Sequence, residues 1–230
     1  MKIFVDSANE AEILRWFGEG IVDGVTTNPT IMLKDGMSDV ECGAKRLCAL
    51  VGERPVSIEV TTNDPAEMLT QARAFASWSR NIVVKIPIVN EFGDSSLHVI
   101  NELTNAGIAI NATAILSFNQ AMLATKAGAT YVSIFVGRIA DEGGDPNIVI
   151  RNTRQWLDQW GLSAQIIIGS VRSVLDIQNA ALAGAHIITV PPQFFPKMID
   201  HKYSRDTVRQ FNRDAEKVFR EANFSTVTTK

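Results

Sequence analysis

Short apolar runs alternate with helix-like segments along almost all of the 230 residues, and this alternation constrains the fold more than any other feature. The runs are rich in Ile and Val, which is typical of parallel strands that are buried on both faces. The expected strands are Ile3–Val5, Gly24–Thr26, Val56–Val60, Ile82–Ile86, Ile108–Asn111, Tyr131–Phe135, Ile166–Ile168 and Ile187–Val190.

The segments between these runs have helical spacing, and each would supply the crossover that a parallel pair of strands requires. Eight strand–helix units in succession favour a closed (β/α)₈ TIM barrel. The alternative is an open, doubly wound sheet with extra strands. The expected helices cover residues 9–17, 39–50, 65–78, 95–105, 118–127, 147–159, 172–183 and 193–200.

A last segment, residues 204–222, is also helical in pattern but falls outside the eight units. Such a helix must cover either the barrel or a neighbouring subunit. No linker rich in Pro, Gly or Ser divides the chain, so we expect a single domain over residues 1–230. The apolar residues at helical spacing in this segment are Val208, Phe211, Ala215, Val218 and Phe219.

The composition is that of a globular protein, with 46% apolar and 20% charged residues. The net charge of −3 argues against a general affinity for nucleic acid. Only three histidines occur, and they are scattered, so we expect no metal site.

Compartment signals in the sequence point to the cytoplasm. Cys42 and Cys48 lie in one expected helix but on different faces, and two free thiols suit a reducing environment. The first ten residues lack the apolar core of a signal peptide, and no apolar run approaches the roughly 18 residues of a membrane span. We therefore expect a cytoplasmic protein without a membrane partner.

Polar residues gather at the carboxyl ends of the expected strands, where barrels of this class build their active sites. They belong to seven of the eight strands or to the residues just after them. These candidates are Asp6, Thr26, Asn28, Glu59, Lys85, Asn111, Thr113, Ser133, Phe135, Arg138, Ser170 and Arg172.

Lys85 is the sharpest signal, because it interrupts the apolar run Ile82–Ile88. A lysine inside a buried strand is costly unless it is paired or neutral. Burial favours the neutral amine, which is nucleophilic and can form a Schiff base with a carbonyl substrate. The alternative is a lysine on an edge strand that extends to solvent.

Asp6 and Glu59 are carboxylates at two separate strand ends. Schiff-base chemistry needs a proton acceptor and a proton donor, and two carboxylates can divide these roles. Asp6 could instead cap the first helix, although Ser7 or Asn9 could do so equally well. Glu59 could instead form an ion pair within the barrel mouth.

Arg138 and Arg172 follow the sixth and seventh expected strands. Guanidinium groups at such strand ends suit a phosphate or another oxyanion. The alternative is a pair of solvated surface arginines.

Four motifs resemble those of the transaldolase family, in the branch of small bacterial and archaeal enzymes that also includes fructose-6-phosphate aldolase. The similarity extends from Lys2 to about Phe219. The motifs are DGVTTNPT at residues 23–30, VVKIP at 83–87, FVGR at 135–138 and GSVR at 169–172.

The resemblance implies catalytic roles for four residues. Lys85 would be the Schiff-base nucleophile, and Asp6 would be the acid and base that acts on the sugar hydroxyl during C–C cleavage. Glu59 and Thr113 would hold a water molecule that carries protons. The implied enzyme is a cofactor-free transferase that moves a dihydroxyacetone unit from fructose 6-phosphate or sedoheptulose 7-phosphate to an aldose phosphate.

The resemblance also implies how the substrate is held. Asn28 and Asn111 would bind hydroxyls of the donor sugar, with Ser133 near its terminal hydroxyl and Thr26 beside them. The distal phosphate would lie at Arg138, Ser170 and Arg172. The family further suggests a homo-oligomer such as a decamer, in which the C-terminal helix packs on a neighbour.

Two positions separate the activities within this family. Aldolase members carry Gln at the position of Glu59 and Tyr at the position of Phe135, so this chain resembles the transferases. A phenylalanine cannot donate the proton that would release the enamine as free ketone. An aldolase remains the alternative, and a non-catalytic sugar-phosphate-binding barrel is the alternative from a different class.

The chain departs from the family pattern near the expected phosphate site. Ile134 stands where a proline is usual, and Gly169 stands where alanine is common. Bulky residues also follow the last strand, at 191–195. A sulfonated sugar such as 6-deoxy-6-sulfofructose is therefore a further candidate substrate.

Overall fold

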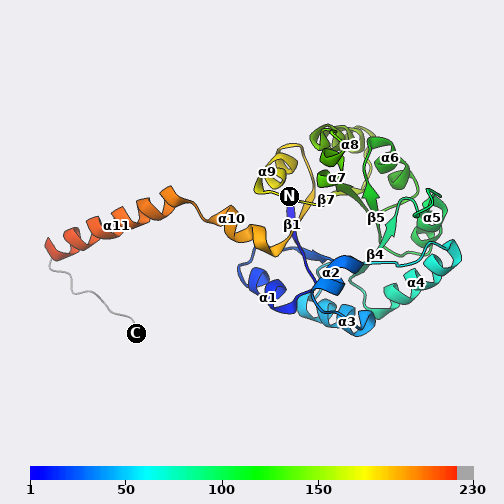
Figure 1. Ribbon diagram of the computed structural model, residues 1–230, viewed down its shortest axis with the longest axis horizontal. Coiled ribbons are helices and arrows are strands. Elements are labelled where there is room, and N and C mark those ends of the chain that lie inside the picture. Colours follow the sequence, from blue (N-terminus) through cyan, green and yellow to red (C-terminus); the bar gives the residue numbers. More distant parts are fainter. Residues whose placement is uncertain (222–230) are drawn as a thin grey trace. The chain divides into compact units, whose positions relative to one another are not determined.

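Eight parallel strands close into a barrel in a computed structural model that describes residues 1–221 (Figure 1). The strands pair in sequence order, and the last pairs back with the first, which confirms the predicted TIM barrel. They are β1 (Lys2–Asp6), β2 (Gly24–Thr26), β3 (Val56–Glu59), β4 (Ile82–Pro87), β5 (Ile110–Ile115), β6 (Tyr131–Phe135), β7 (Gln165–Gly169) and β8 (Ile187–Val190).

Helices surround these strands, as Figure 1 shows. Most begin at an Asn, Asp or Ser whose side chain accepts a hydrogen bond from the first turn, which is the usual N-cap. In the barrel they are α1 (Glu10–Gly18), α2 (Pro29–Lys34), α3 (Val40–Val51), α4 (Pro65–Trp78), α5 (Leu97–Asn105), α6 (Phe118–Lys126), α7 (Val136–Asp141), α8 (Pro146–Trp160) and α9 (Val174–Leu182).

Two short helices, α2 and α7, were not predicted. In α2, Asn28 is the N-cap and Pro29 occupies the first turn, a combination that marks a helix start in sequence. α7 follows β6 directly, and its N-cap residue, Phe135, makes no capping hydrogen bond through its side chain, so no such signal announces the helix. Both helices follow strands whose ends carry candidate site residues.

β5 begins and ends later than predicted, at Ile110–Ile115 instead of Ile108–Asn111. The strand continues through Asn111 and Thr113, and its pairing with β6 shifts register between Ala112 and Ile115. Ala114 has a φ of 56° within this irregularity. Such a bulge re-aims neighbouring side chains, and here it lies next to Thr113.

The barrel interior has an apolar layer with a polar layer above it. Phe4, Ile167 and Ile187 pack together with Tyr131 in the lower layer. Side chains two residues apart share one face of a strand, so Asp6, Ser133, Gly169 and Thr189 form part of the next layer toward the carboxyl ends. An interior layer of this kind is commonly filled by branched apolar side chains. The polar layer is therefore where a site is expected.

The chain divides into two compact units. The first, Met1–Pro192, contains the complete barrel, and the second begins at Gln193. The second contains α10 (Phe195–Ile199) and α11 (Lys202–Glu221), of which α11 corresponds to the predicted segment 204–222 as far as the structure describes it. A 3₁₀ turn, η1 (Pro192–Phe194), precedes them. Over residues 1–221, no helix has the length and apolar character to cross a membrane.

Cys42 and Cys48 both lie in α3, the first exposed and the second buried, and both are free thiols.

We expect His186 to make the barrel less stable in mild acid. Its Nδ1 accepts a hydrogen bond from the Ile166 N–H at 3.0 Å, and burial together with nearby Arg154 lowers its pKa. The unfolded chain therefore binds more protons than the native state as the pH falls below about 6.5. His186 contributes its full share of stability above that pH and loses it as the pH falls toward the folded-state pKa.

Urea unfolding between pH 5 and 7 tests this prediction. The free energy of unfolding should fall less steeply with decreasing pH in His186→Asn than in wild type. His201→Asn changes an exposed histidine and should keep the wild-type slope. Equal slopes for His186→Asn and wild type would contradict the prediction.

Candidate active site

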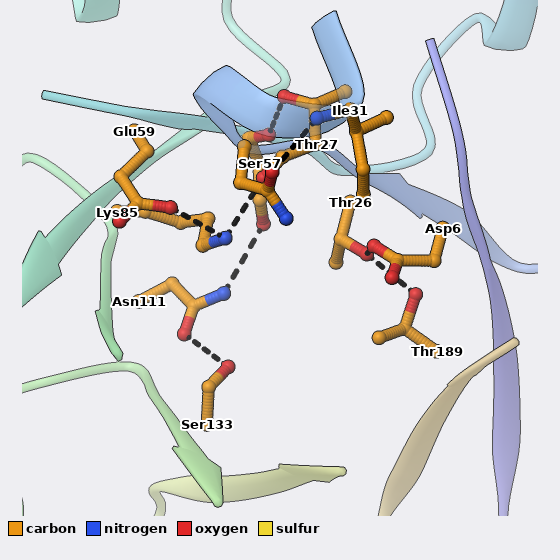
Figure 2. Close-up of polar contacts among 11 residues, drawn as sticks. Asp6, Thr26, Thr27, Ile31, Ser57, Glu59, Lys85, Asn111, Ser133 and Thr189 are labelled. Atoms are coloured by element: carbon orange, nitrogen blue, oxygen red, sulfur yellow. Dashed lines mark hydrogen bonds and ion pairs between the residues drawn. The ribbon is translucent and has the colours of Figure 1, made fainter. Parts of the chain in front are cut away.

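Lys85 lies in β4 between β3 and β5, and only 5% of its surface is exposed. Its Nζ is 2.8 Å from Glu59 Oε2 and donates a hydrogen bond to the Thr27 carbonyl oxygen, also at 2.8 Å (Figure 2). The alternative of an edge-strand lysine that reaches solvent is therefore wrong. A carboxylate and a backbone oxygen fix the amine at the base of the barrel mouth.

Glu59 lies opposite Lys85 in the pairing of β3 with β4. Its side chain is 17% exposed, so the ion pair is close to solvent on the carboxylate side only. The predicted alternative, an ion pair in the barrel mouth, thus describes the resting contact. The same contact gives a proton a direct path between the amine and the carboxylate.

Asp6 does not cap the first helix, because Asn9 is the N-cap of α1 and accepts from the Glu12 N–H. Asp6 Oδ1 instead accepts a hydrogen bond from Thr26 Oγ1 at 2.7 Å. Burial raises the pKa of the Asp6 carboxyl, although the Thr26 hydrogen bond and the charge of Lys85 oppose this effect. Asp6 is therefore a carboxylate that takes up a proton more readily than an exposed aspartate.

A chain of three polar side chains runs across β6, β5 and β3. Ser133 Oγ donates to Asn111 Oδ1 at 2.7 Å, and Asn111 Nδ2 donates to Ser57 Oγ at 3.4 Å (Figure 2). All three residues are buried. Because every partner comes from a different strand, the barrel itself fixes how these groups are oriented.

Thr113 is buried, and its hydroxyl oxygen makes no hydrogen bond with any residue in the described part of the chain. An unsatisfied buried hydroxyl is costly, and in native structures it usually has a water or ligand partner. Thr113 lies in β5, opposite Pro87 at the end of the strand that carries Lys85.

Two adjoining cavities open at this end of the barrel. The inner one, of about 30 Å³, is lined by nine residues, among them Asp6, Lys85, Ser133 and Thr189. The outer one, of about 450 Å³, is lined by residues that include Glu59 and Arg138. The two share the residues Asp6, Asn28, Phe135 and Ser170.

Asn28 serves as both a structural and a lining residue. Its Oδ1 caps α2 by accepting from the Ile31 N–H at 2.9 Å. This hydrogen bond fixes the side chain and leaves the Nδ2 group as the part of the amide that can donate to a bound molecule.

Arg138 and Arg172 are exposed and converge on Asp141 of α7. Asp141 accepts two hydrogen bonds from the Arg172 guanidinium and is 4.0 Å from Arg138. Among the three, Arg138 lines the outer cavity, whereas Arg172 is directed to the carboxylate. The structure therefore brings both arginines together, with an acidic residue between them.

Gly137 makes this arrangement possible. A Cβ at this position would lie 2.4 Å from the Ser170 carbonyl oxygen and 2.7 Å from Arg172 Nε. Ser170 itself has a φ of 58°, an uncommon backbone conformation for a residue other than glycine. The loop after β7 is thus held tightly against the start of α7.

Sequence reasoning missed several members of the site. Thr189 and Ser57 are polar residues within short apolar strands, and each occupies a face that alternation assigns to the interior. The sequence alone could therefore have indicated these two residues. The Thr27 carbonyl and the Asp141 side chain carry no comparable signal, because their roles depend on how separate loops meet. Within residues 1–221 no group of three or more His, Cys, Asp or Glu side chains is placed to hold a metal ion.

Comparison with known proteins agrees with this geometry. The family described as transaldolase/fructose-6-phosphate aldolase matches residues 3–230. This protein therefore belongs to the transaldolase/fructose-6-phosphate aldolase family.

Two relatives that it matches carry the first of these two names. It is 43% identical over 216 residues to a probable transaldolase 2 of Listeria monocytogenes, covering 94% of this chain and 96% of the relative. It is 41% identical over 218 residues to a probable transaldolase of Dehalococcoides mccartyi, covering 95% and 99%.

Solved structures at low identity share the fold. A 2,3-dimethylmalate lyase matches 93% of this chain and 83% of its own, with a TM-score of 0.58 at 16% identity. A thiamine phosphate pyrophosphorylase from Pyrococcus furiosus matches 83% and 85%, with a TM-score of 0.57 at 15% identity.

Proposed function

We propose that this protein is a class I transaldolase, which transfers a dihydroxyacetone unit from a ketose phosphate to an aldose phosphate through a Schiff base. One observation carries the proposal: a buried lysine amine, paired with a carboxylate, lines a cavity that a second carboxylate also lines. A non-catalytic binding barrel has no use for this arrangement, because a buried lysine costs stability. The family membership supports the same choice.

The first step is attack of the Lys85 amine on the ketose C2 carbonyl. The proton that leaves the ammonium can pass to Glu59, whose Oε2 is 2.8 Å away. A carbinolamine forms, and loss of water gives the protonated Schiff base. Thr113, with its unsatisfied hydroxyl, and Glu59 are the groups proposed to hold the water molecule that carries protons in this step.

The second step breaks the bond between C3 and C4. Asp6 takes the proton from the C4 hydroxyl, the aldose leaves, and the bonding electrons pass to the Schiff base to give an enamine on Lys85. The enamine then attacks an acceptor aldehyde, and Asp6 returns its proton to the new hydroxyl. Hydrolysis of the Schiff base frees the product ketose and the amine.

The hydroxyls of the donor would be bound by Asn28, Asn111 and Ser133, with Thr26 close to Asp6. The connections Ser133–Asn111–Ser57 and Thr26–Asp6 orient these groups before any ligand binds. Such preorganisation reduces the reorganisation needed when charge develops in the transition state.

Phe135 distinguishes the transferase from the aldolase, since it lines both cavities and has no hydroxyl to protonate the enamine. Wild type given fructose 6-phosphate without an acceptor should therefore stall after roughly one turnover per site, whereas erythrose 4-phosphate should restore steady turnover. Phe135→Tyr should release dihydroxyacetone without acceptor up to 10²–10⁴-fold faster, the range that general acid catalysis provides. The measurement is free dihydroxyacetone against time.

Phe118→Tyr adds the same hydroxyl in α6, where the ring packs on Trp156, and serves as the matched control. It should behave as wild type does. Rapid multi-turnover release by wild type without acceptor would contradict the transferase and favour the aldolase.

Arg138, Arg172 and Ser170 are proposed to bind the terminal anion of the substrate. Replacing either arginine with alanine removes a charge-assisted interaction and should weaken productive binding of a ketose phosphate by about 1.5–3 kcal/mol. An unphosphorylated ketose should lose much less, and Arg80→Ala, an exposed arginine paired with Glu53, should change neither. Measuring kcat/KM for both ketoses, and for a sulfonated ketose, also identifies the preferred anion. Equal losses of kcat/KM for the phosphorylated, unphosphorylated and sulfonated ketoses would contradict the role of these arginines in binding the anion.

The proposed assembly is a homo-oligomer, for which the family suggests a decamer. Side chains on α11 that are apolar and exposed in the single chain include Tyr203, Val208, Phe211, Val218 and Phe219. A helix with so many exposed apolar residues is typical of a surface that another subunit covers. Light scattering of wild type and Phe211→Asp tests this assembly, and a monomeric wild type would contradict it.

A further inference from the structure

Three side chains from neighbouring strands form a second polar chain, separate from that of Ser133. Asp6 ends β1, and its register partner Thr26 ends β2. Thr189 comes from β8, on the opposite side of β1. Thr26 Oγ1 is 2.7 Å from Asp6 Oδ1 and 2.5 Å from Thr189 Oγ1 (Figure 2). Thr26 is 3% exposed and Thr189 is 4% exposed.

The direction of these hydrogen bonds follows from the number of protons available. A hydroxyl has one proton to donate, and an ionised carboxylate has none. If Thr26 gives its proton to Asp6, the contact between the two threonines must be a bond donated by Thr189. The order is therefore Thr189 to Thr26 to Asp6, with every proton directed toward the carboxylate.

From this order we infer that Thr189 is a positioning residue, which holds the Thr26 hydroxyl in the orientation that stabilises ionised Asp6. The inference rests on the proposed role of Asp6 as the acid and base. Without Thr189, the Thr26 hydroxyl could rotate and donate elsewhere. Asp6 would lose one of the two interactions that oppose the effect of burial, and it would hold its proton up to a higher pH. The charge of Lys85 would still favour the ionised carboxylate, and those of Glu59 and Asp35 would still disfavour it.

The geometry also explains which carboxylate oxygen is left for the substrate. Thr26 occupies Oδ1, while Oδ2 has no hydrogen-bond donor among the described side chains. Thr189 and Asp6 both line the inner cavity with Lys85. A fixed Oδ1 leaves Oδ2 as the oxygen available to a sugar hydroxyl. Thr189 would therefore determine the orientation of the Asp6 carboxylate as well as its pKa.

The test compares Thr189→Val, which has nearly the same shape but no hydroxyl, with Thr189→Ser, which keeps the hydroxyl. The carboxyl ¹³C signal of Asp6, identified by its loss in Asp6→Asn, is titrated by NMR in each protein. We expect the Asp6 pKa to rise by about 0.5–1 unit in Thr189→Val, the shift that corresponds to losing one hydrogen bond. Thr189→Ser should return it close to the wild-type value.

Activity provides an independent second measurement. The acid limb of the kcat/KM profile for transfer should move upward by the same amount in Thr189→Val, while borohydride should trap ketose on Lys85 as in wild type. Thr153→Val is the matched control, because Thr153 is a buried threonine of α8 that bonds only its own helix. It should alter neither the titration nor the profile.

An unchanged Asp6 pKa in Thr189→Val would overturn the inference, and so would a shift of equal size in Thr153→Val. If Thr189→Val does not fold, Thr189→Ala takes its place in both measurements. Because the NMR titration needs no turnover, it tests Thr189 even if wild type fails to trap ketose, and that failure would count against the proposed function alone.

Discussion

Replacing Lys85 with methionine should abolish capture of a ketose by borohydride and lower transfer activity by on the order of 10⁶-fold, the loss seen when other covalent nucleophiles are removed. The physical reason is that Lys85 is the lysine that lines the inner cavity, where Glu59 and the Thr27 carbonyl fix its amine. The measurement is intact mass after borohydride treatment with fructose 6-phosphate, followed by mapping of the modified peptide. Wild type should gain one dihydroxyacetone or ketose adduct, on the peptide that contains Lys85.

Lys85→Arg is the matched variant, because it keeps a positive charge beside Glu59 but cannot form the Schiff base. It should be as inactive as Lys85→Met. Any difference in stability between the two then reports the cost of an unpaired carboxylate, which is about 3–5 kcal/mol for a fully buried pair and less here because Glu59 is partly exposed. Trapping of Lys85→Met at the wild-type level would refute the assignment of the nucleophile.

Asp6→Asn should separate the two halves of the reaction. Schiff-base formation uses Lys85 and Glu59, so borohydride should still trap the ketose. Cleavage of the C3–C4 bond should fall by about 10²–10⁴-fold, because asparagine cannot accept the C4 hydroxyl proton. The measurement is aldose release in a single turnover, beside trapping of the same sample.

Asp35→Asn is the control for this variant. Asp35 accepts hydrogen bonds from the Ser7 hydroxyl and the Ala8 N–H, next to Asp6 in sequence, and lines neither cavity. The Asp35→Asn variant should retain cleavage.

Since burial raises the pKa of Asp6, wild-type cleavage should lose its base at a higher pH than an exposed aspartate would allow. Normal aldose release by Asp6→Asn would contradict the proposed role.

The alternation of short apolar runs with helix-like segments, together with the polar residues at the strand ends, made most of the barrel predictable. The run of eight short apolar segments indicates a closed parallel barrel, and one lysine within such a run identifies the centre of the site. The limits of β5 were less accessible, because Asn111 and Thr113 are polar residues that look like the end of a strand. They belong to it because their side chains face the interior, which local composition does not reveal.

Contacts between separate loops were the part that sequence could not supply. Arg138 and Arg172 were predicted as a pair for an anion, but the carboxylate of Asp141 between them depends on where α7 places it. Thr189 was passed over because a threonine in a β-strand is ordinary. Its proposed positioning role depends on two neighbours, Thr26 and Asp6, which lie more than 160 residues away in sequence.

The two layers inside the barrel differ in which substitutions they tolerate, although their positions lie only two residues apart along each strand. Phe4, Ile167 and Ile187 fill space beneath the site, and shortening them would leave a cavity in a close-packed interior. Directly above, Ser133 and Thr189 contribute little volume and much polarity. A map of all single substitutions should therefore show two stacked rings, the lower one governing whether the chain folds and the upper one governing which donor sugars react. New substrate ranges could then evolve in the upper ring while the lower ring stays unchanged.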